Sequence, residues 1–129
     1  MSNIDSLKYR IWSIARQRYI DDVVLHPDGS FAIYDFSLLE YTDPMTENNG
    51  YSIERCTGLK DKHGNLIYKG DVLEWDMSVT PVYVQWNSNN CRFALHRFDV
   101  KGWSISLIQD TASRYTIIGN IHTLLIDKE

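Results

Sequence analysis

Histidine, acidic and cysteine side chains are the groups of this sequence that could support catalysis. A catalytic site would have to bring His63 and Asp71 together with His122 or Asp110, with a serine or Cys56 as the nucleophile. The sequence contains no nucleophile elbow that would place such groups side by side. Since Cys56 adjoins a predicted strand, a buried and unreactive thiol is the simpler interpretation. We therefore predict that the protein is not an enzyme.

Metal and cofactor sites are not indicated either. The four histidines have no metal-ligand spacing: His26 and His63 fall in predicted turns, and His96 and His122 in predicted strands. The sequence has no glycine-rich phosphate loop, paired-histidine zinc helix or calcium loop. Cys56 and Cys91, without a CxxC motif, are interpreted as small buried residues in a reducing compartment. We predict no metal, no cofactor and no disulfide.

The charge distribution suggests a binding surface at the N-terminal end. Residues 1–20 carry a net charge of +3, and the whole chain carries −4, so the remainder carries −7, the difference between the two. A basic strand with an aromatic residue could contact nucleic acid or an acidic partner, although a solvated strand face is the commoner explanation. The candidate contact residues are Lys8, Arg10, Trp12, Arg16 and Arg18. The acidic remainder argues against strong nonspecific DNA binding.

The elements that position these residues are predicted to be mostly strands. In "LKYRIWS", alternation places Leu7, Tyr9 and Ile11 on a buried face and the basic residues with Trp12 on the other. Trp12 would then either stack under Arg10 at the surface or be covered by a later segment. The following "SIARQRYIDD" could form a helical turn at most.

Turn residues divide the rest of the chain. "VVLHPDGSFAIYDF" predicts a hairpin, and the cluster of Pro, Asn and Gly at residues 42–50 predicts a loop and an internal boundary. Six further β-prone segments follow, namely "YSIERCTGL", "NLIYKGDVLEW", "PVYVQW", "CRFALHRF", "WSISLIQD" and "YTIIGNIH". Short strands at this spacing predict a mainly β fold with a small barrel or sandwich.

The segment "TGLKDKHGNLIYKGDVLEW" at residues 57–75 is interpreted as scaffolding. Asp61, His63, Gly64 and Asn65 predict a tight turn with Gly64 at positive φ, and a second turn at Gly70 leads into "VLEW". The Asp71 carboxylate is placed to accept backbone N–H groups of its own turn. Its predicted role is therefore structural.

At these residues the sequence resembles the YopX-like family of phage and prophage proteins. The resemblance is carried by residues 56–75, by "VYVQW" at 82–86, by "YTIIGNIH" at 115–122 and by "KYRIW" at 8–12. The residues taken as its structural signature are Gly58, Asp61, Gly64, Tyr68, Gly70, Asp71, Gly119 and Asn120. After "GNIH" the chain continues "TLLIDKE", whereas many relatives have an Asn-Pro-rich end.

The resemblance implies a compact, mainly β domain without an established activity, whose C-terminal part is similar to an SH3-type barrel. We predict a single domain over 1–129, with a strand and hairpin portion at 1–50 and an SH3-like barrel at 56–122. Because the sequence shows no secretion signal and no membrane span, we expect a soluble, cytoplasmic protein. The function we predict is that of a non-catalytic accessory module that self-assembles or binds a phage or host protein. Weak nucleic-acid binding is the alternative.

Overall fold

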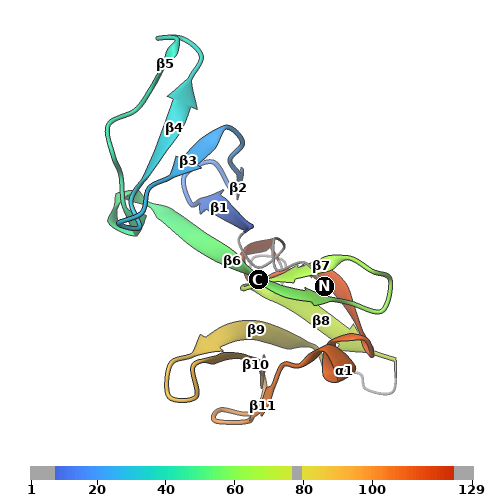
Figure 1. Cartoon of the computed structure of the whole chain (residues 1–129). Helices are drawn as coiled ribbons and strands as arrows, with labels where there is room; N and C mark the ends of the chain where they lie inside the picture. Colours follow the sequence, from blue (N-terminus) through green and yellow to red (C-terminus); the bar gives the residue numbers. More distant parts are fainter. Residues whose placement is uncertain (1–7, 77–79, 124–129) are drawn as a thin grey trace. The chain divides into compact units, whose positions relative to one another are not determined.

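A computed structural model describes residues 8–76 and 80–123 of the chain (Figure 1). Of these residues, 50% lie in strands and 9% in helices, which confirms the predicted mainly β fold. The chain divides into two compact units: an N-terminal unit, Tyr9–Glu54, and a C-terminal unit of Lys8 with the described residues from Arg55 onward. None of the described helices is long and apolar enough to cross a membrane. Leu7 and the divergent end from residue 124 lie outside the described residues.

The N-terminal unit begins with a hairpin. Strands β1 (Tyr9–Ser13) and β2 (Arg18–Tyr19) pair antiparallel, and Gln17 adopts a φ of 55° in the turn between them. The predicted helical turn is present, since Gln17 donates its N–H to Ser13, four residues earlier, at 2.9 Å. The short strand β2 was not predicted, and the left-handed Gln17 lets it return alongside β1. The sheet that contains this hairpin has the strand order β2-β1-β6-β7, where β6 (Tyr51–Lys60) and β7 (Leu66–Tyr68) continue it into the C-terminal unit.

A second, three-stranded sheet completes this unit. It contains β3 (Val23–Leu25), β4 (Phe31–Asp35) and β5 (Glu40–Tyr41) in antiparallel order. The β3–β4 turn confirms the predicted hairpin, since the Asp28 carboxylate accepts hydrogen bonds from the backbone and hydroxyl of Ser30. The predicted loop at 42–50 is also present and includes the short 3-10 helix η2 (Glu47–Asn49).

The C-terminal unit contains the predicted succession of short strands. β6 (Tyr51–Lys60) crosses into it from the N-terminal unit and pairs with β7 (Leu66–Tyr68). The strands β8 (Asp71–Trp75), β9 (Val82–Asn87), β10 (Arg92–Arg97), β11 (Ser104–Ser106) and β12 (Tyr115–Asn120) form a five-stranded antiparallel sheet. Its order is β11-β10-β9-β8-β12, and the short helix α1 (Gln109–Ala112) precedes β12. The sheet curls into a half barrel, while its likeness to an SH3 barrel stays a prediction.

Alternation along the strands explains the core of the C-terminal unit. On β9, Val82 and Val84 are buried, and the residues between and after them are only partly covered. The buried cluster contains side chains from one face of the curled sheet and from the elements that cover this face. Its members are Ile67, Leu73, Val82, Val84, Leu95, Leu107, Ala112 and Tyr115.

Asp61 fastens the first signature turn to a distant strand. One carboxylate oxygen accepts hydrogen bonds from the backbone N–H groups of His63 and Asn65, both at 2.9 Å. The other oxygen accepts the N–H of Ile117 on β12 at 3.1 Å. Because the side chain is buried, these bonds replace water as its partners. Asp61 therefore has a structural role.

The second signature turn is held by Asp71, as predicted. Its carboxylate accepts the N–H of Tyr68 at 2.7 Å. Gly70 in the same turn donates its N–H to Val84 and accepts the N–H of Ile121, each at 2.9 Å. Asn120 then accepts the N–H groups of the next turn through its side chain. This cap ends β12 before His122, so the prediction that places His122 in a strand is wrong.

Replacing either turn glycine with valine is expected to destabilise the protein by roughly 1–3 kcal/mol. Gly64 and Gly70 have φ values of 84° and 88°, which a β-branched residue tolerates poorly. A Cβ on Gly64 would meet no heavy atom within 4 Å, so the cost there comes from the backbone alone. Thermal melting of Gly64→Val and Gly70→Val tests this, with Gly64→Asn as the control because asparagine accepts a left-handed conformation. Unchanged midpoints would contradict it.

Candidate functional site

Of the side chains considered for catalysis, Asp71 and Cys56 are buried in the fold, whereas His63 and Asp110 are exposed. Asp71 is buried and bonded to Tyr68, and Cys56 is buried on β6 with its sulfur accepting the N–H of Gly58 at 3.4 Å. Within residues 8–76 and 80–123, no group of three or more His, Cys, Asp or Glu residues could hold a metal ion. The expectation that both cysteines are buried is wrong for Cys91, which is exposed. Its φ of 50° places it in the turn between β9 and β10.

The predicted N-terminal contact residues are divided between the interior and the surface. Trp12 is only 3% exposed, and its ring meets the edge of Tyr19 at a centroid distance of 4.9 Å. Of the two alternatives for Trp12, the structure shows the covered one, so the prediction of one buried and one open face is wrong for this strand. Its partner Tyr19 comes from β2, the strand that sequence analysis missed.

Arg10 faces the interior of the same unit. Its Nε lies 2.7 Å from Oε1 of Glu54, and its guanidinium lies 4.5 Å from the centre of the Tyr19 ring. The Tyr19 hydroxyl donates to the same Glu54 oxygen at 2.8 Å. Lys8, Arg16 and Arg18, in contrast, are exposed. Any contact with nucleic acid through this segment therefore depends mainly on the three exposed residues.

A different surface of the N-terminal unit stands out in the structure. The turn between β4 and β5 presents three large apolar side chains to solvent: Phe36 is 67% exposed, Leu38 66% and Leu39 75%. These are the highest exposed fractions among the large hydrophobic residues of the described chain. We call these three residues the hairpin tip. Clustered exposed apolar side chains of this kind mark interaction surfaces.

Local bonds and aromatic contacts hold the hairpin tip in place. The Asp35 carboxylate accepts the backbone N–H and the hydroxyl of Ser37 and the N–H of Leu38. The Ser37 hydroxyl and backbone bonds, with help from the nearby positive charge of Arg16, hold the pKa of Asp35 below its ordinary value despite opposing desolvation. Behind the turn, the Tyr34 ring makes edge contacts with Phe36 at 4.7 Å and with Tyr41 at 5.1 Å. These bonds and contacts give the hairpin tip a defined conformation.

A hollow of about 430 Å³ lies beside this hairpin. Aromatic and aliphatic side chains form part of its wall, and charged and hydroxyl groups form the rest. The lining residues are Arg16, Ile33, Tyr34, Asp35, Phe36, Ser37, Thr42 and Tyr51. Leu38 and Leu39 are not among them, so the two leucines of the tip leave the hollow of their own unit open. We call it the hairpin hollow.

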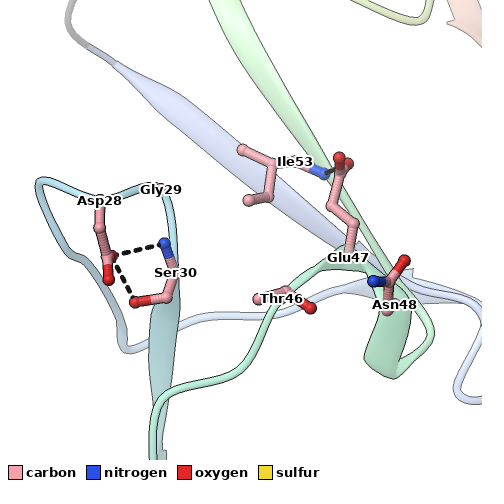
Figure 2. A pocket seen from close by; sticks show the side chains of 7 residues that line it. All are labelled: Asp28, Gly29, Ser30, Thr46, Glu47, Asn48 and Ile53. Atoms are coloured by element: carbon pink, nitrogen blue, oxygen red, sulfur yellow. Dashed lines mark hydrogen bonds between the residues drawn. The ribbon is translucent and has the colours of Figure 1, made fainter.

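A second hollow of about 360 Å³ in the same unit is shown in Figure 2. Its two carboxylates, those of Asp28 and Glu47, accept hydrogen bonds from nearby backbone N–H groups. Asp28 binds Ser30, as the dashed lines show, and Glu47 accepts the N–H of Ile53 at 2.7 Å. The two carboxylates of this hollow therefore stabilise the loops to which they belong.

The hairpin tip was not predicted from the sequence, because the segment "DFSLLEY" does not show the alternation of a strand. An Asp-x-Ser turn signal followed directly by two leucines is the feature that could have identified it, since a turn exposes what it carries. Single apolar residues on a surface are common, whereas this turn exposes three of them within four positions.

Comparisons with known proteins give a family and a fold. The family model described as YopX protein matches residues 8–124. Among solved structures, the crystal structure of protein EF1440 from Enterococcus faecalis is similar, with a TM-score of 0.62 and 22% sequence identity. The similarity covers 95% of this chain and 97% of that one, and at this identity it shows a shared fold alone. No significant match was found among curated proteins.

Proposed function

The chain belongs to the YopX protein family, and from this premise we propose that it is a non-catalytic accessory module of a phage or prophage that acts by binding a second copy of itself. The observation that carries the proposal is the exposed hairpin tip of Phe36, Leu38 and Leu39. These apolar side chains extend into water, and covering them with a partner lowers the free energy of the system. A second copy is the partner whose supply does not depend on another gene product.

The size of the hairpin tip suits a weak and reversible association. Full burial of a Leu or Phe side chain is worth about 1.5–3 kcal/mol, so three side chains from each of two copies, already partly covered, contribute roughly 6–12 kcal/mol. Loss of translational and rotational freedom opposes this with about 4–15 kcal/mol. These opposing contributions nearly cancel, so the hairpin tip alone supports a weak contact, and a micromolar oligomer requires further contacts around it.

The bonding of the reactive groups supports a non-catalytic role. Asp61 and Asp71 use their carboxylates to hold turns, and Cys56 is buried in a strand pair. A general base or nucleophile needs access to a substrate atom, and these groups are used for the fold instead. The exposed Lys8, Arg16 and Arg18 leave nucleic acid as the competing partner, with a salt-sensitive contact.

Light scattering after size exclusion tests the proposal. We expect the wild type to form a discrete oligomer at micromolar concentration, and the variant Phe36→Ser/Leu38→Ser/Leu39→Ser to be a folded monomer, because its tip has lost the apolar surface. The matched control is Val100→Ser/Ile108→Ser/Ile118→Ser, which removes three exposed apolar residues from the C-terminal unit and should leave the oligomer intact. A monomeric wild type, or an oligomeric tip variant, would refute the proposal.

A parallel titration addresses the competing partner. Fluorescent single-stranded and duplex DNA are expected to bind weakly at physiological salt, because the chain as a whole is acidic. Nanomolar binding by a monomer would reverse the order of the two functions and place the contact at Lys8, Arg16 and Arg18.

A further inference from the structure

We infer that the association is reciprocal: the hairpin tip of each copy enters the hairpin hollow of the other, and Glu40 of each copy pairs with Arg16 of the other. This inference rests on the proposed self-association and specifies its contact. The juxtaposition that carries it is the exposed hairpin tip beside the hairpin hollow on one unit: Phe36 belongs to both, whereas Leu38 and Leu39 do not line the hollow.

The hairpin tip and the hairpin hollow have matching chemistry. Tyr34, Phe36 and Tyr51 give the hollow an aromatic wall, and Ile33 adds aliphatic surface. Leucine side chains suit such a wall, because anchor residues of stable interfaces are apolar groups that fill a pocket on the partner. Leu39 has the larger exposed fraction of the two tip leucines, 75%, and is the anchor we assign.

The positions of the hairpin tip and the hairpin hollow on one surface fit a two-fold contact. In an isologous dimer both subunits use the same surface patch, so a protruding tip and the hollow that receives it must lie on one patch of the molecule. Here the lining of the hollow includes Phe36 and Ser37, which lie directly before Leu38 and Leu39 in the turn. One surface therefore carries both halves of the contact.

Charged residues beside the hairpin tip and the hairpin hollow set the orientation of the proposed contact. Arg16 lines the hollow together with the acidic residue Asp35, whose carboxylate accepts hydrogen bonds from Ser37 and Leu38 and also lies near enough to Arg16 to be affected by its charge. Glu40 follows Leu39 at once, is exposed and does not line the hollow of its own unit. When Leu39 enters the hollow of a second copy, it carries Glu40 toward the Arg16 of that copy. Complementary charges of this kind contribute specificity and orientation.

Charge reversal in two separate chains tests the contact. Arg16→Glu and Glu40→Arg should each weaken self-association by roughly tenfold or more, because each places like charges opposite one another at both ends of a two-fold interface. Mixing the two variants should restore binding, since each end of the mixed dimer then pairs a Glu with an Arg. Energy transfer between dyes on the exposed Cys91 thiol would report the mixed dimer.

The matched control is Arg18→Glu, which makes the same charge change on an exposed residue that does not line the hollow. It should weaken association less than Arg16→Glu, and its mixture with Glu40→Arg should not recover wild-type affinity. Loss of binding in the single variants without rescue in the Arg16→Glu and Glu40→Arg mixture would overturn the inference. If the tip variant is monomeric and this mixture fails, the proposed self-association stands with a different register. A monomeric wild type removes both.

Discussion

Arg10→Met is expected to lower the free energy of unfolding by about 3–5 kcal/mol, the largest stability effect that we expect from a single substitution in this protein. Arg10 is the cationic partner of Glu54, whose side chain is only 1% exposed. Methionine keeps the apolar stem of the arginine but removes the charge, so a buried carboxylate loses its counter-ion. A carboxylate in that position cannot be rehydrated without opening the sheet around it.

Two further variants separate the charge from the packing. Glu54→Gln keeps an oxygen for the Tyr19 hydroxyl and should cost less than Arg10→Met, since it removes the buried charge together with its bond to Arg10. The double variant Arg10→Met/Glu54→Leu should recover much of the loss, because an apolar pair replaces a broken ionic one. Urea denaturation followed by circular dichroism gives the three values. Equal losses for Arg10→Met and for the double variant would contradict this account of the pair.

Asp61→Ala is expected to destabilise the protein by roughly 2–4 kcal/mol, because three backbone N–H groups lose their acceptor at once. Those groups belong to His63 and Asn65 in the turn and to Ile117 on β12. The substitution therefore loosens both the turn and its attachment to the sheet. Asp110→Ala removes an exposed carboxylate of the same unit and should change stability little.

Asp61 also predicts a pH dependence. Burial raises the pKa of this carboxyl, but the backbone bonds from Ile117, Asn65 and His63 together outweigh burial and hold the pKa below its ordinary value. A depressed folded pKa contributes stability that is complete above the unfolded value, about 3.9, and is lost as the pH falls through the folded pKa. The wild type should thus lose stability below pH ~4 more steeply than Asp61→Asn. Parallel acid unfolding curves would contradict this.

Local chemistry was predictable from the sequence, and long-range packing was not. The turns at Gly64 and Asp71 were predicted correctly because their bonds join residues a few positions apart. The covering of Trp12 depends on Tyr19, and the pairing of Arg10 depends on Glu54, which lies 44 positions away. An alternating pattern cannot report a partner at that separation, so the strand looked like a basic surface. The mainly β fold followed because many short segments agreed on it.

The candidate site was invisible for a related reason. A pattern of Phe36, Leu38 and Leu39 states that three residues are apolar, and core residues have the same composition. Only the three-dimensional structure shows that these side chains stay 66–75% exposed in their own unit. Exposure of apolar side chains results from the whole fold, whereas a turn can be predicted from its own few residues.

Strand β6 constrains how genes of this type can exchange parts. Its residues 51–54 belong to the N-terminal unit and its residues 55–60 to the C-terminal unit, so the border falls within one continuous ten-residue strand. A recombination crossover at that border would join half of β6 from one gene to half of β6 from another. The pairing with β7 and the burial of Glu54 would be kept only if both genes encode the same strand register. The second border between the units lies between Lys8 and Tyr9, and the carbonyl of Lys8 accepts the N–H of Cys56. A crossover there would have to preserve this bond as well. Because the sheet β2-β1-β6-β7 includes strands of both units, exchange of one unit without the other would disrupt this sheet.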